Sequence, residues 1–168
     1  MNADATPPLR PAVLPLRLAA MIYEAVLLFG VVFIVSYALL ALFQWKYPLP
    51  PGPRTTLQVV LFLSIGGYFV WCWSRSGQTL ALKTWNLKVL DERNAPPSVG
   101  RSVARYVLAW HLWLPGLLWL ALFQTHAIVV LFALAFGFAA LMLPALVDPQ
   151  RRLLHDRWTG TRVVRIGP

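Results

Sequence analysis

Four long apolar runs constrain this chain more than any other feature of its sequence. They cover residues 18–43, 57–73, 103–123 and 127–146. A helix needs about 20 apolar residues, with a range of about 17 to 25, to cross the hydrocarbon core of a bilayer. Only 12% of the residues are charged, against about 25% in soluble domains. The sequence therefore predicts an all-α membrane protein with four transmembrane helices, a basic cytoplasmic middle loop and a basic C-terminal tail.

Short connections and small residues indicate how these helices are joined and packed. The Pro-rich stretch at 47–53 cannot continue a helix and predicts an exposed turn between the first and second spans. Only residues 124–126 separate the third and fourth spans, so we expect a tight helical hairpin there. Gly66 and Gly67 in the second span predict close contact with a neighbouring helix.

The distribution of basic residues predicts the orientation. Of the 15 Lys and Arg residues, 13 lie before the first span, in the 74–105 segment or after residue 146, and two lie at 44–56. By the positive-inside rule, both termini and the middle loop are cytoplasmic, in the inner (plasma) membrane. Because these charges flank spans, the expected partner is anionic lipid headgroups, and nucleic acid is not expected.

Glu24 is the one acidic residue of the first apolar run. A charge at this depth costs about 2.5 to 3.5 kcal/mol on insertion scales and normally has a polar partner. Arg17 shares its helix face but lies roughly 10 Å away along the axis, so we expect the partner on another helix. Two interpretations follow. Glu24 carries a proton or cation, or it is a structural partner of Arg101 or Arg105 at the start of the third span.

Two histidines, His155 and His111, are also candidates for polar roles. His155 and Asp156 could form a proton relay at the inner mouth, or they could hold the tail to the middle loop. His111 lies inside the third predicted span, where a hydrogen bond to another helix is expected.

The middle loop contains mixed apolar and basic residues. Residues 80–89 suit a segment lying on the inner membrane surface, but Leu87, Val89 and the 161–166 segment could instead form short strands. The 91–94 segment before two prolines predicts a turn, and Ser98 is a candidate cap for the helix that follows.

Three short motifs, in order around these spans, resemble the RDD family of membrane proteins. The family takes its name from an arginine at the start of the first membrane helix and two aspartates, the first inside that helix. The matching residues are Arg17 with Glu24, then Gly77, Gln78 and Thr79, then Asp148, His155, Asp156, Gly160 and Thr161. Two departures are the glutamate at position 24 and Ala81-Leu82, where a Gly-Lys pair is usual. The resemblance covers an RDD-like membrane domain at 17–164, which leaves an N-terminal tail at 1–16, cytoplasmic by the positive-inside rule, and a short C-terminal end at 165–168.

The resemblance implies a small ion or solute transporter, with monovalent cation/proton exchange as one form. The ion or proton pathway candidates are Glu24, Arg17, Arg105, His155 and Asp156. Four spans rarely enclose a pathway alone, so a homo-oligomer or a membrane partner is expected. The alternative is a non-transporting scaffold or assembly factor that binds anionic lipid or a partner protein. Because no phosphate-binding loop, metalloprotease motif or nucleophile elbow is present, we expect no enzyme activity, no cofactor and no metal site.

Overall fold

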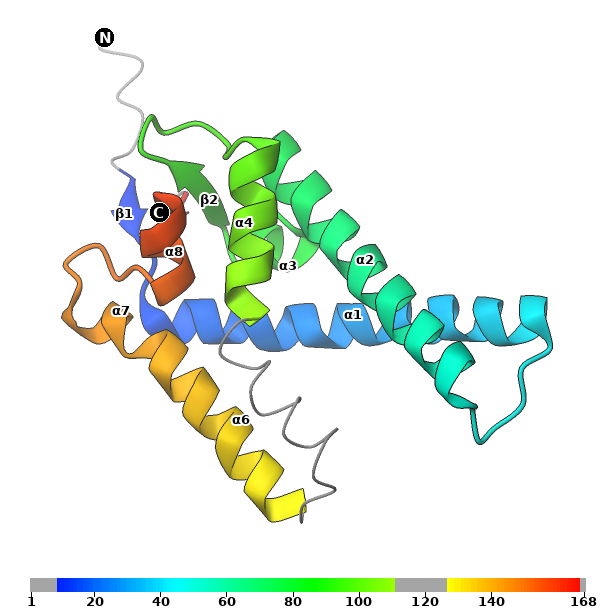
Figure 1. Ribbon diagram of the computed structural model, residues 1–168. Helices are drawn as coiled ribbons and strands as arrows, with labels where there is room; N and C mark the ends of the chain where they lie inside the picture. The colour runs from blue at the N-terminus through cyan, green and yellow to red at the C-terminus, as the bar shows by residue number, and fades with distance from the viewer. Residues whose placement is uncertain (1–8, 111–126, 167–168) are drawn as a thin grey trace, which may run out of the picture.

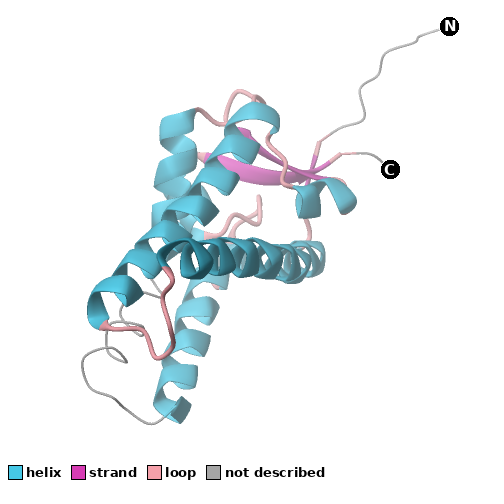
Figure 2. Ribbon diagram, turned by 90° about the vertical axis from the view of Figure 1, so that its right-hand side faces the viewer, coloured by secondary structure: helices cyan, strands magenta, loops and turns pink. Residues whose placement is uncertain are grey.

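The computed structural model describes residues 9–110 and 127–166 as a mostly helical chain with a small sheet at one end (Figure 1). The elements are, in chain order, β1 (Arg10–Pro11), α1 (Leu14–Phe43), α2 (Pro51–Ser76), α3 (Leu80–Thr84), β2 (Leu87–Asp91), α4 (Val99–Trp110), α6 (Ala127–Met142), α7 (Pro144–Val147), α8 (Leu154–Thr159) and β3 (Thr161–Arg165). Helices α1, α2 and α6 extend away from the end that contains the sheet, α4 and α8 (Figures 1 and 2).

Within residues 9–110 and 127–166, two helices are long and apolar enough to cross a membrane. They are α1, with 30 residues, and α2, with 26. The first ends at Gln44, which has a left-handed backbone, and the Pro-rich connection follows before the second begins at Pro51. The structure thus contains two candidate membrane-spanning helices, close to the first two predicted runs.

The four-span arrangement stays a prediction. Helix α4 covers the first part of the third predicted span, and α6 covers most of the fourth. The remainder of the third span, the 124–126 turn, His111 and His126 lie outside the described residues.

A three-stranded antiparallel sheet corrects the all-α prediction. Its strand order is β1-β3-β2, and β2 pairs with β3 from Leu87 opposite Arg165 to Asp91 opposite Thr161. Leu87, Val89 and Val163 are buried in one cluster with Trp73 and Tyr106. Alternate apolar residues therefore place one sheet face against the helices, and the strand alternative is correct for both segments.

The middle loop is fixed by backbone contacts and caps. Gly77 has φ +72°, and a Cβ atom there would lie 2.5 Å from the carbonyl oxygen of Val89. The Asp91 carboxylate accepts backbone N–H bonds from Arg93 and Ala95, both at 2.9 Å, which confirms the predicted turn. The hydroxyl oxygen of Ser98 accepts the N–H of Arg101 at 3.4 Å, as a cap of α4 does.

Helices α2 and α4 are in close contact at one glycine. A Cβ atom on Gly66 would lie 2.8 Å from the ring of Tyr106, whereas one on Gly67 would meet nothing within 4 Å. The Tyr106 hydroxyl also donates to the carbonyl oxygen of Phe62, at 2.8 Å. The predicted close packing is confirmed at Gly66.

Candidate functional site

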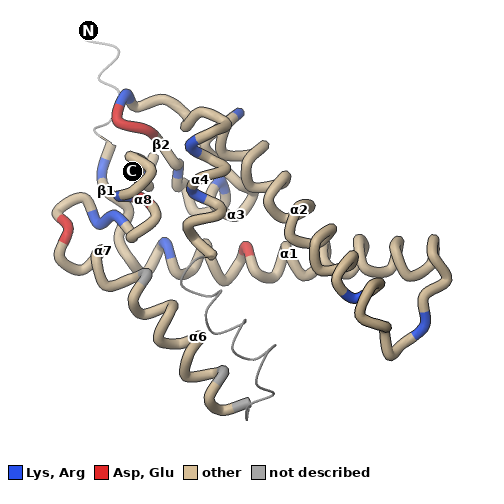
Figure 3. Tube along the Cα trace, viewed as in Figure 1, with Lys and Arg blue, Asp and Glu red and all other residues tan. Residues whose placement is uncertain are grey.

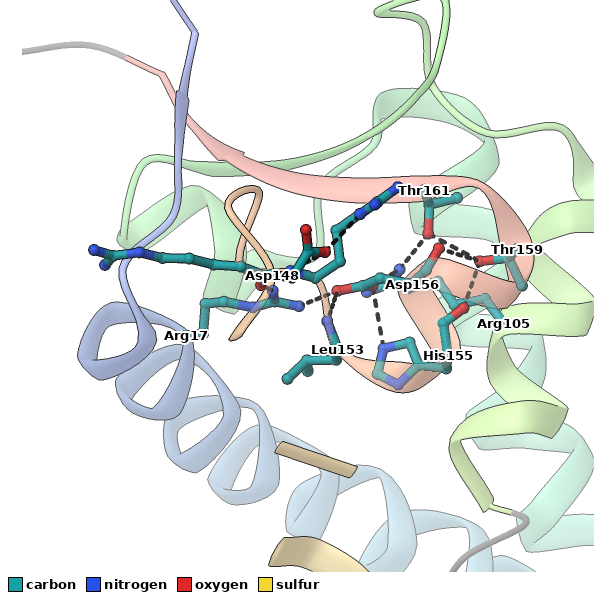
Figure 4. A network of polar contacts seen from close by, with 10 residues as sticks. Arg17, Arg105, Asp148, Leu153, His155, Asp156, Thr159 and Thr161 are labelled. Atoms are coloured by element: carbon teal, nitrogen blue, oxygen red, sulfur yellow. Dashed lines mark hydrogen bonds and ion pairs between the residues drawn. The ribbon is translucent and has the colours of Figure 1, made fainter. Parts of the chain in front are cut away.

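Asp156 joins three elements that are far apart in the sequence. Arg17 of α1 and Arg105 of α4 each contact one of its two carboxylate oxygens (Figure 4). All three side chains are buried. The backbone N–H of Leu153 also donates to the Asp156 carboxylate, at 3.0 Å, so both carboxylate oxygens of this acid have partners.

Neighbouring residues extend this cluster toward the sheet and α2. Arg105 also donates to the Thr161 hydroxyl at 2.7 Å, and its guanidinium carbon lies 4.9 Å from the centroid of the Trp73 ring. The Arg17 guanidinium donates to the carbonyl oxygen of Arg151 at 2.6 Å. The cluster therefore ties α1, α4, α8 and β3 together around one carboxylate.

The charges in the cluster set its protonation states. Burial alone would raise the pKa of the Asp156 carboxyl, but the Arg105 and Arg17 charges outweigh it and hold this pKa well below its usual range. Burial lowers the pKa of His155, against the attraction of Asp156, so its imidazole is neutral near neutral pH. Its Nε2 atom lies 3.3 Å from Asp156.

The tail contacts the middle loop through the pairing of β3 with β2. Asp156, also in the tail, contacts Arg17 of α1 and Arg105 of α4 instead.

Glu24 has different partners from those predicted. The Tyr68 hydroxyl donates to one oxygen of its carboxylate at 2.7 Å, and the Thr79 hydroxyl donates to the other. Arg105 is paired with Asp156, and Arg101 lies 3.7 Å from Asp91. Of the two interpretations of Glu24, the ion pair with Arg101 or Arg105 is therefore wrong, because each of these arginines pairs with another acid.

Thr79 and Tyr68, which both donate to Glu24, belong to different elements, the start of α3 and the middle of α2. Thr79 caps the short helix α3, where its hydroxyl oxygen accepts the N–H of Leu82 at 3.2 Å. Gln78, beside it, donates its side-chain amide to the carbonyl oxygen of Leu87 at 2.8 Å. The Gly-Gln-Thr motif thus positions a hydroxyl at a buried acid. Sequence reasoning missed Tyr68, because one tyrosine among the aromatic residues of α2 carries no distinguishing signal.

The C-terminal motif, which runs from Asp148 to Thr161, forms the turns that position Asp156. The Asp148 carboxylate accepts from the side chain of Arg152 at 2.7 Å, and this bond lowers the pKa of the Asp148 carboxyl. Gly160, with φ +62°, ends α8 in a left-handed conformation just before Thr161 begins β3. Asp148 and Gly160 therefore shape the turns before and after α8, the helix that contains Asp156.

Four of the five predicted pathway residues share a cavity of about 630 Å³. Its wall includes Arg17, Glu24, Arg105 and His155, together with Thr79. The fifth candidate, Asp156, is not part of this wall but contacts Arg17 and Arg105. Aromatic and aliphatic side chains form most of the remaining wall, including Phe69, Trp73, Tyr106, Trp110, Phe138 and Met142. A carboxylate with two hydroxyl oxygens, exposed to such a space, can hold a proton or a hard cation.

The fold and this cavity define a helical membrane-type protein with a small sheet at one end. The chain belongs to the RDD family, whose family model matches residues 11–160. No curated protein and no solved structure matches the chain.

Proposed function

We propose that this protein is a small ion or solute transporter and that it exchanges a monovalent cation for a proton at Glu24. One observation carries the proposal. The buried Glu24 carboxylate lies on a cavity wall and is hydrogen-bonded by two hydroxyls, with no Lys or Arg of the described residues in ion-pair contact. A carboxylate without a fixed counter-charge can bind a proton or a cation in turn.

The surroundings of Glu24 support reversible binding. Hydroxyl groups can both donate and accept, so Tyr68 and Thr79 can donate to the charged carboxylate and rotate when it takes up a proton or a cation. An arginine partner would have only donors and a permanent charge, which disfavours cation entry.

Flux through purified protein in proteoliposomes tests this proposal. With an imposed pH gradient, sodium, potassium or lithium should dissipate the gradient through the unmodified protein. Glu24→Gln keeps the shape of the side chain but cannot ionise, so cation-dependent dissipation should disappear. Glu92→Gln is the matched control, because Glu92 is exposed in the loop before α4 and flux should be retained. Equal flux in the Glu24→Gln protein, or none above protein-free vesicles, would contradict the proposal.

We also propose an inner (plasma) membrane location with both termini cytoplasmic and with anionic lipid headgroups at the basic end. The support is the distribution of charge. Lys46 lies in the connection between α1 and α2, and Arg54 lies in the first turn of α2. The other basic segments gather around the sheet end (Figure 3). A non-transporting scaffold would use this same basic end, and it is the function left if the flux experiment fails.

A further inference from the structure

Two obligatory hydrogen-bond donors beside the cavity have no acceptor among the residues that the structure describes. The Nε1 atom of Trp73 and the Nε atom of Arg105 are buried and without a hydrogen-bond partner within the described part of the chain. Trp73 is 8% exposed and Arg105 is 4% exposed. Both side chains line the cavity, and the Arg105 guanidinium lies over the Trp73 ring. Neither group can accept a hydrogen bond, and no described residue supplies an acceptor, so an acceptor brought by a ligand would satisfy both.

The charge at this end of the cavity favours an anionic acceptor. Arg17 and Arg105 share the single carboxylate of Asp156, and His155 beside them is neutral. The cluster therefore contains one positive charge more than it contains negative charges. A ligand anion at Arg105 would balance it, because the Glu24 carboxylate on the same wall is hydrogen-bonded to Tyr68 and Thr79 and is in ion-pair contact with no Arg of the described residues.

The shape and wall of the cavity indicate the rest of the ligand. A volume of about 630 Å³ lies within the range of about 300 to 1,000 Å³ that is typical of ligand sites. Most of the wall is apolar, and Phe69, Tyr106 and Met142 contribute to it. Such a wall gains free energy by covering a hydrocarbon chain and gains little from a bare inorganic ion.

We propose that the cavity binds a single-chain amphiphilic anion, a long-chain carboxylate, with its headgroup at Trp73 and Arg105 and its chain along the apolar wall. This binding goes beyond cation exchange at Glu24 and does not depend on it. Glu24 is hydrogen-bonded to Tyr68 and Thr79, so it leaves the two unpaired donors to the anion.

Binding of radiolabelled hexadecanoate to the purified full chain in neutral maltoside micelles tests the proposal, with protein-free micelles as the blank. Trp73→Phe removes the indole N–H and keeps most of the ring, so hexadecanoate should bind about tenfold more weakly. Trp71→Phe is the matched control, because Trp71 lies two residues away on α2 and is 61% exposed. Its affinity should equal that of the unmodified protein.

A second variant and three competitors distinguish recognition of the carboxylate headgroup from nonspecific hydrophobic binding. Ala109→Phe enlarges a side chain on the cavity wall and should weaken hexadecanoate binding by about tenfold or more, even if Trp73→Phe fails to fold. Methyl hexadecanoate, hexadecyltrimethylammonium and acetate should all compete poorly. Competition by the neutral ester or the cation that equals that of the acid would overturn the proposal. Unchanged affinity in Trp73→Phe, or no binding above the blank, would overturn it as well.

Discussion

Asp156 and Glu24 are both buried acids, but their surroundings differ in kind. Asp156 has no exposed surface and forms ion pairs with two arginines. Glu24 accepts hydrogen bonds from two hydroxyls and lies on the wall of a cavity. Permanent positive charges hold Asp156 in one protonation state. Glu24 has hydroxyl partners, with no Lys or Arg of the described residues in ion-pair contact, as the proposed exchange at this residue requires. The contrast teaches that partner chemistry, more than burial, separates a structural carboxylate from a candidate carrier.

The largest expected effect is the loss of the Asp156 charge. Asp156→Asn leaves Arg17 and Arg105 buried without a counter-charge, which should lower the free energy of unfolding by about 3 to 5 kcal/mol. Denaturant titration in mixed micelles, followed by circular dichroism, measures this change. Asp148→Asn is the control: its one ion pair is with the partly exposed Arg152, so the loss should be much smaller. Equal losses in the two variants would break the comparison.

Lowering the pH should test the charge state of the Asp156 cluster without a mutation. The pKa values of Asp156 and His155 are lower in the folded chain, so the unfolded chain binds more protons as the pH falls. The thermal midpoint should therefore fall, first below about pH 6.5 through His155 and further below about pH 4 through Asp156. His155→Asn should flatten only the first decline. A midpoint that rises between pH 6 and pH 4 would contradict this assignment.

Helix packing offers an intermediate effect. Gly66→Ala places a methyl group against the Tyr106 ring, next to the Arg105 that binds Asp156, and should cost about 1 to 3 kcal/mol. Gly67→Ala meets open space and should be neutral or slightly stabilising. Thermal unfolding of the two variants side by side is the measurement. If both behave alike, α2 and α4 are not packed through Gly66.

The smallest effect on stability should come from Glu24. Glu24→Gln keeps an acceptor for one hydroxyl and removes a buried charge, so the free energy of unfolding should change by no more than about 1.5 kcal/mol. The same denaturant titration as for Asp156→Asn gives a direct comparison. A loss as large as that of Asp156→Asn would place Glu24 among the structural residues.

Local features could be predicted from the sequence because neighbouring residues determine them. The first two long helices, the turn at Asp91, the cap at Ser98 and the glycine contact at Gly66 all follow from short-range patterns. The two segments of the sheet could only be named as candidates, because five-residue strands carry too little periodicity to be distinguished from a surface segment.

The partners of the two acids could not be predicted, because they depend on contacts distant in sequence. Tyr68 lies 44 residues from Glu24, and Asp156 lies 51 residues from Arg105. The position of Arg105 at the start of the third predicted span made it a candidate partner for Glu24, and only the folded tail shows that Asp156 takes that arginine. The family resemblance named Thr79 and Asp156 without indicating which residue each would contact.

The link between Arg17 and Asp156 also has a consequence for biosynthesis. These residues are 139 positions apart, so a ribosome adding about 5 to 20 residues per second needs roughly 7 to 28 seconds to supply the second after the first. The central strand of the sheet, β3, emerges later still. During that interval Arg17 lacks its Asp156 partner, and its charge is best accommodated by water or lipid phosphates. Closure of the sheet end is therefore a late event, after both long helices have been made.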